Sequence, residues 1–150
     1  MKILNYILIL IVFITYSCSS ESSNRSDTVP AFKSNFGFEP PIEVKIIKLK
    51  NYSIRDAFAH WMCFTYHKET FDKILDHDKP LGIVKSNTLK YKKIVKEFQN
   101  PNQPDWFENP QKGISKIYFK DQFLKHTYSD YYMWIDSTNN MVYFHVSYFD

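Results

Sequence analysis

His60 and Cys63 are the two side chains whose types and spacing come closest to those of a catalytic pair. The surrounding sequence predicts a helix over 54–65, and residues three apart lie on the same face of a helix. A thiol beside an imidazole acts as a nucleophile where substrate and a positive environment reach it. The apolar neighbours Trp61 and Met62 favour instead a buried cysteine that packs as a small hydrophobic side chain. We therefore predict no catalytic residue here.

Metal-ligand types gather around a short predicted helix over 68–76, namely His67, Glu69, Asp76, His77 and Asp78. Adjacent residues point in different directions, so a complete site would need a distant ligand such as His126. The simpler interpretation is a solvated helix end. We predict no bound metal and no cofactor.

Asp105 and Glu108 lie on either side of Trp106 and could serve as the paired carboxylates of a hydrolase. An aspartate after a proline is more typical of a turn or a helix cap. With three glycines in the whole chain, the sequence forms no glycine-rich phosphate loop. An envelope hydrolase with an unrecognised site stays open as the alternative function.

The chain begins with one positive charge at Lys2, followed by an apolar run from Ile3 to Ile14. A short basic start before an apolar stretch of roughly 7–15 residues is typical of a secretory signal. Crossing the bilayer takes about 20 apolar residues, so the run is short for a membrane-spanning helix. We expect export from the cytoplasm.

The segment Ile14-Thr15-Tyr16-Ser17-Cys18 resembles the lipobox of bacterial prolipoproteins, with the small Ser17 directly before the cysteine. Thr15 and Tyr16 depart from the aliphatic and small residues that the family usually has at these positions. The resemblance implies cleavage before Cys18, a thioether-linked lipid on that cysteine and an acylated amino end. Several acyl chains together hold a protein firmly to a bilayer. The expected location is the bacterial envelope, with the membrane itself as one partner.

Composition narrows the function classes further. The formal charge is +3, and Arg25 and Arg55 are the only arginines. Nucleic-acid readers rely on arginine and on basic patches, and an exported protein meets little nucleic acid, so we exclude that class. Once Cys18 carries lipid, Cys63 has no cysteine partner, and we expect no internal disulfide.

We expect three regions along the chain. Residues 1–17 form the signal peptide, and residues 18–31 form a flexible lipidated tether, because serines and charges dominate a stretch with few large apolar side chains. Residues 32–150 form a single folded domain of ordinary size.

The expected fold class is α+β: an N-terminal strand, three helices, then a C-terminal antiparallel meander of three to four strands. The strand covers 42–50, with a bulge where the alternation slips at Ile47. A capping box from Ser53 to Asp56 would begin the first helix, and the other two helices cover 68–76 and 88–99. The meander strands are expected at 114–120, 123–128, 130–136 and 141–149.

The last hairpin defines a candidate binding surface. Its pairing places Tyr131, Met133 and Ile135 on the core face with Val142, Phe144 and Val146. The opposite face carries Tyr132, Trp134, Tyr143 and His145. If these rings are exposed, they form a platform for a protein or a sugar. If loops of the chain cover them, they stabilise the sheet.

The function expected from the sequence is that of a non-enzymatic, lipid-anchored binding module at the envelope. Its partner is expected to be another protein, as for an immunity-type protein or an accessory of a surface complex, with carbohydrate as the other option. The envelope hydrolase is the rival class.

Overall fold

The computed structural model describes residues 17–77, 81–85, 88–98, 102–110, 116–124 and 127–149. In chain order its elements are β1 (Ser17–Ser22), α2 (Arg25–Phe36), β2 (Ile46–Ile54), β3 (Ala57–Thr65), α3 (Lys68–His77), β4 (Gly82–Lys85), α4 (Leu89–Glu97), β5 (Lys116–Leu124), β6 (Thr127–Asp136) and β7 (Met141–Phe149). This mixture confirms the α+β class. The order of the elements differs from the expected one.

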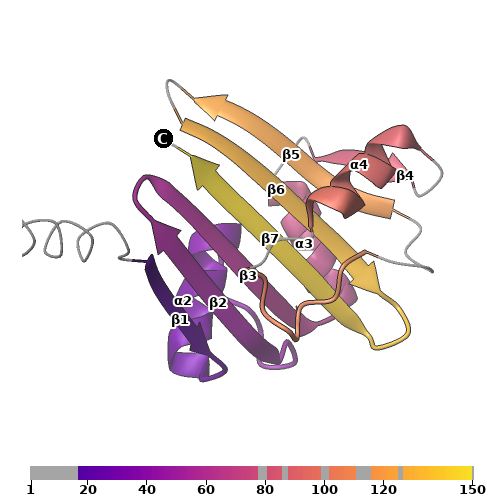
Figure 1. Cartoon of the computed structure of the whole chain (residues 1–150). Coiled ribbons are helices and arrows are strands. Elements are labelled where there is room, and N and C mark those ends of the chain that lie inside the picture. The colour runs from indigo at the N-terminus through magenta and orange to yellow at the C-terminus, as the bar shows by residue number, and fades with distance from the viewer. Residues whose placement is uncertain are drawn as a thin grey trace, which may run out of the picture.

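The strands form one seven-stranded sheet in the order β1-β2-β3-β7-β6-β5-β4. Every neighbouring pair is antiparallel. Figure 1 shows α2 and α3 behind the sheet, and α4 with the 102–110 segment in front of it. We call these two sides the α2/α3 face and the α4 face. Among the described residues, no helix is long and apolar enough to cross a membrane.

The core on the α2/α3 face is built largely from phenylalanine. Phe32 and Phe36 project from α2, one turn apart, and both are fully buried. Their rings lie 5.2 and 5.9 Å from that of Phe64 on β3, and Phe36 lies 4.9 Å from Phe144 on β7. Such edge-to-face pairs stabilise a core beyond the area that they bury.

The helix predicted over 54–65 is wrong, because this segment is strand β3, paired with β2 and β7. Both faces of β3 are covered, so apolar side chains follow one another without the alternation that marks a half-exposed strand. The expected capping box is the β2–β3 turn, in which Arg55 has a φ of 50°.

The flexible tether predicted for residues 18–31 is also wrong. Most of this segment lies in β1, which pairs with β2, or in the first half of α2. Backbone bonds to β2 hold the polar strand β1, and Phe32 and Phe36 dock the helix beyond the predicted tether. Composition misses these long-range contacts, because few apolar residues lie within 18–31 and the two phenylalanines that dock the helix lie just beyond it.

Several smaller predictions are confirmed. The β2–β3 register shifts between Ile46 and Lys48, which is the bulge expected at Ile47. The second and third predicted helices correspond to α3 and α4, and Thr88 caps α4 by accepting a hydrogen bond from the backbone N–H of Tyr91. Strand β7 has the expected bounds. The strand predicted at 130–136 lies within β6, whereas the one predicted at 123–128 is wrong, because it combines the end of β5 with the start of β6.

Candidate functional site

The four residues of the predicted binding surface lie together on the α4 face. Tyr132 pairs with His145 and Trp134 pairs with Tyr143, as the sequence predicts. The opposite set, including Met133 and its partner Phe144, belongs to the α2/α3 core. The faces of the last hairpin are therefore assigned correctly.

The same four residues do not form an exposed platform, because the chain covers them. Exposed fractions are 9% for Tyr132, 0% for Trp134, 5% for Tyr143 and 8% for His145. Phe98 at the end of α4 lies 5.0 Å from Trp134 and 5.2 Å from Tyr132, between ring centroids.

Phe107 completes the cover from the 102–110 segment, with its ring 5.3 Å from Trp134 and 5.5 Å from Tyr143. The buried Phe107 ring fixes the 102–110 segment to the body of the domain. The second interpretation, in which loops of the chain cover the rings, is the one that the structure shows.

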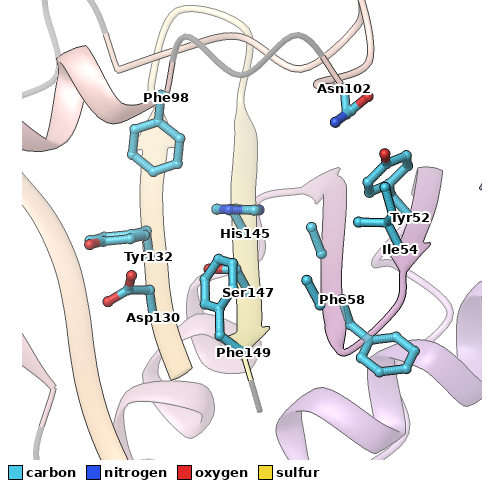
Figure 2. Close-up of a pocket in the computed structure, with 12 residues that line it drawn as sticks. Tyr52, Ile54, Phe58, Phe98, Asn102, Asp130, Tyr132, His145, Ser147 and Phe149 are labelled. Atoms are coloured by element: carbon cyan, nitrogen blue, oxygen red, sulfur yellow. The ribbon is translucent and has the colours of Figure 1, made fainter. Parts of the chain in front are cut away.

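The cover ends before the sheet does, and a cavity of about 370 Å³ remains at the uncovered end. Figure 2 shows Tyr132 and Asp130 on one side of it, Tyr52 and Ile54 on the other, and His145 between them. Ala57 and Ala59 of β3 line the same space, together with Phe58, Phe98, Asn102, Ser147 and Phe149. The small side chains of Ala57, Ala59 and Ser147, on the central strands β3 and β7, leave this space open. Larger residues on the neighbouring strands and segments enclose it.

His145 is a strongly perturbed titratable group of the cavity. Burial lowers its pKa to about 4, so the ring is neutral at pH 7. Nδ1 lies 3.0 Å from the backbone oxygen of His60. Because a carbonyl only accepts, Nδ1 carries the proton and Nε2 is the unprotonated nitrogen. The ring also stacks on Trp61, 5.0 Å between centroids. A base of such low pKa is weak at neutral pH.

The structure does not bring Cys63 and His60 together as a pair. On a strand, residues three apart point to opposite faces, and Cys63 packs in the α4-face cluster. Burial raises the pKa of the Cys63 thiol to about 11, so the nucleophilic thiolate is suppressed. His60 Nδ1 lies 2.7 Å from the side-chain oxygen of Asn51.

The other chemical candidates are scattered over the surface. His67 Nδ1 contacts the Thr70 hydroxyl at 2.9 Å. Within the described residues no three metal-ligand side chains converge. Asp78 and His126 lie outside those residues. Asp105 and Glu108 are both exposed, in the 102–110 segment that covers the sheet.

The fold and the cavity define an α+β domain with a ligand-sized hollow on one face of an antiparallel sheet. No protein family, curated protein or solved structure matches the chain.

The cavity residues Tyr52, Ile54, Ala57 and Ala59 are not among the predicted site residues, because the sequence pattern predicts a helix in or beside which they lie. A strand interpretation of 57–65 would have set the two alanines on the same face as Trp61 and Cys63.

Proposed function

We propose that this chain is a lipid-anchored, non-enzymatic binding module of the bacterial envelope, and that its cavity receives an apolar side chain of a protein partner. The observation that carries the proposal is the cavity itself. Its volume of about 370 Å³ falls within the range of about 300–1,000 Å³ typical of ligand sites. Apolar walls and a few polar groups, such as Ser147 and Asp130, are the usual composition of a binding pocket.

The titration properties favour binding over catalysis. His145 has a lowered pKa and Cys63 a raised one, so burial weakens the base and the nucleophile that would be most useful to a hydrolase. A protein partner fits better than a carbohydrate. Sugar recognition by stacking needs exposed ring faces, and Trp134 and Tyr143 are buried under Phe107.

The anchor is proposed from the leader and from the position of Cys18. The leader resembles a prolipoprotein signal that ends at this cysteine. Cys18 is exposed near the start of the edge strand β1, where an acylating enzyme has access to its thiol. Replacing Cys18 by alanine should abolish incorporation of labelled fatty acid into the protein. Unchanged labelling would contradict the anchor.

The binding site is tested by filling the cavity. Ala59→Phe places a ring between Tyr52 and Ser147, and Ser137→Phe adds the same ring to the exposed turn at the other end of the sheet. Full-length protein is crosslinked in cells, purified, and its partners are identified by mass. A partner held by the wild type and Ser137→Phe but lost from Ala59→Phe supports the proposal. Equal capture by all three, or hydrolytic activity in a substrate screen, contradicts it.

A further inference from the structure

We propose that the end of the sheet at which β1 begins rests on the membrane, and that four exposed apolar side chains there contact lipid. These side chains, here called the apolar rim, are Ile54, Phe58, Tyr128 and Phe149. The inference rests on the proposed anchor at Cys18 and adds an orientation to it.

Ile54, Tyr128 and Phe149 lie in one row across neighbouring strands, and Phe58 follows this row on the opposite face of the sheet. Backbone pairing joins Cys18 to Ser53, the residue before Ile54, and runs on from Ile54 to Ala57, from Ala57 to Phe149 and from Phe149 to Tyr128. Figure 1 shows the start of β1, the β2–β3 turn and the end of β7 along the left side of the sheet.

The row lies close to the proposed lipid. Strands are about 4.8 Å apart, so Tyr128, four strands away from β1, lies about 19 Å from the anchored strand. The whole rim is therefore within reach of the surface to which Cys18 is attached.

Exposed apolar side chains concentrate at this end. The rim residues are exposed by 39% for Ile54, 45% for Phe58, 38% for Tyr128 and 48% for Phe149. Among the described residues, the other large exposed apolar side chains are Ile42, Ile83 and Leu89, one each in three separate segments. An aromatic ring with a polar tip, such as that of Tyr128, is suited to the membrane interface.

The opposite end of the sheet is polar. The β6–β7 turn consists of Ser137, Thr138, Asn139 and Asn140, all exposed. Asp136 accepts a hydrogen bond from the backbone N–H of Thr138 at 2.9 Å and one from the side chain of Asn139 at 2.7 Å. A polar turn of this kind is suited to contact with water. The apolar end of the sheet therefore suits the lipid side of a membrane surface, and the polar end suits the aqueous side.

No flexible linker separates the proposed anchor from the rim. Cys18 lies within β1 and pairs with Ser53, the residue before Ile54. A lipid on Cys18 therefore holds this end of the domain against the bilayer and keeps the rim at high local concentration there. The adjoining turn residues, Arg55 and Asp56, have opposite charges, so the contact should depend little on anionic lipid.

The orientation also narrows the partner class. Ile54, Phe58 and Phe149 belong both to the rim and to the wall of the cavity. The cavity therefore opens beside the bilayer, and its protein partner is itself located at the membrane.

The test measures the depth of labelled positions in the full-length protein, purified from membranes and reconstituted into vesicles. Single cysteines replace Ile54, Phe149 or Thr138 in a Cys63→Ala background, and each carries an environment-sensitive fluorophore. The vesicles contain phosphatidylethanolamine and phosphatidylglycerol, or phosphatidylcholine alone, with a fraction of lipid that carries a shallow quencher. We expect at least threefold stronger quenching at 54 and 149 than at 138, in both lipid mixtures.

A second comparison separates the rim from general hydrophobicity. With the label at 128, the triple variant Ile54→Ser, Phe58→Ser and Phe149→Ser should lose most of the quenching. A matched triple variant, Ile42→Ser, Ile83→Ser and Leu89→Ser, should keep it. Circular dichroism checks that each variant is folded.

The two proposals fail in different ways. Intact acylation of Cys18 by mass, with no quenching at 54 and 149 or with equal quenching at 138, overturns the orientation and leaves the anchor standing. A chain without acyl mass on Cys18 contradicts the anchor, and the orientation with it.

Discussion

The two faces of the sheet are both aromatic, but their most deeply buried rings are of different kinds. On the α2/α3 face, Phe32, Phe36 and Phe144 carry no polar atom and are fully buried. On the α4 face, Trp134 and His145 carry N–H groups that need partners once they are removed from water. The most deeply buried rings of the first face serve packing alone, with tyrosines such as Tyr118 and Tyr131 around them, whereas the second face buries indole and imidazole groups at its centre.

The cover over the two faces also differs. The α2 and α3 helices contribute buried side chains to the α2/α3 face, among them Phe32, Phe36, Phe71 and Ile74. On the α4 face, α4 and the 102–110 segment stop short of one end and leave the cavity. We infer that the α2/α3 face supplies most of the stability, and that the α4 face gives up some packing for a binding site.

Truncating a ring on the α2/α3 face should give the largest effect. Phe36→Ala removes contacts with Phe32, Phe64 and Phe144, and we expect a loss of about 4–5 kcal/mol in the free energy of unfolding. Phe107→Ala on the α4 face should cost about 3 kcal/mol, because a loop can settle into the space left behind. Urea unfolding measures both losses. Equal losses would break the distinction between the faces.

Acid should weaken the domain through the α4 face. The pKa of His145 is about 4 in the folded protein and about 6.5 when unfolded. Between these values the unfolded chain binds a proton that the folded chain does not, so stability falls as the pH falls from about 6.5 to 4. The expected loss is about 3 kcal/mol.

The control for this prediction is His145→Phe, measured by urea unfolding across the same pH range. The variant should lose most of the pH dependence between pH 7 and 4, whatever its stability at pH 7. A small dependence should remain, since burial also lowers the pKa of His60. An unchanged slope would show that the acid sensitivity arises elsewhere.

The difference between the faces also explains which parts of the fold the sequence could predict. The hairpin β6–β7 can be predicted from the sequence. Met133 and Phe144 face one core, Trp134 and Tyr143 face the other, and a run of polar residues marks the turn. Strand β3 is equally buried on both sides, and its continuous apolar run is compatible with a helix as much as with a strand.

The candidate site is less predictable than the fold. Tyr132 and His145 could be placed on one face from strand parity alone. The cavity depends on Tyr52, Ala59 and Phe98, which meet only when three separate segments pack on one sheet. Their burial and spacing follow from tertiary contacts, and no local pattern encodes them.

Introducing a larger side chain should also change the stability differently on the two faces, but by less than truncating a ring does. Val146 is fully buried on the α2/α3 face, and Val146→Leu should cost about 1–3 kcal/mol because no space is left for the added methylene. Ala59→Leu adds more atoms on the α4 face, but they enter the cavity, and we expect a change below about 1 kcal/mol. Thermal unfolding compares the two variants. A larger loss for Ala59→Leu would mean that the cavity is not available space.

The smallest effect on stability is expected from removing a polar group of the α4 face that itself destabilises the folded protein. In the described part of the chain, Trp134 Nε1 is buried and has no hydrogen-bond partner. An unsatisfied buried donor costs about 1–3 kcal/mol, and Trp134→Phe removes it while leaving a ring to pack against Phe98 and Phe107. The loss of packing and the relief of this cost should nearly cancel, so the stability should change by less than about 1 kcal/mol.

Urea unfolding at pH 7 measures the change, and Trp134→Ala, expected to lose about 3–5 kcal/mol, is the control. A loss above about 2 kcal/mol in Trp134→Phe would mean that the indole N–H is bonded in solution. The polar rings of the α4 face would then add to its stability, and the contrast with the α2/α3 face would lie in the cavity alone.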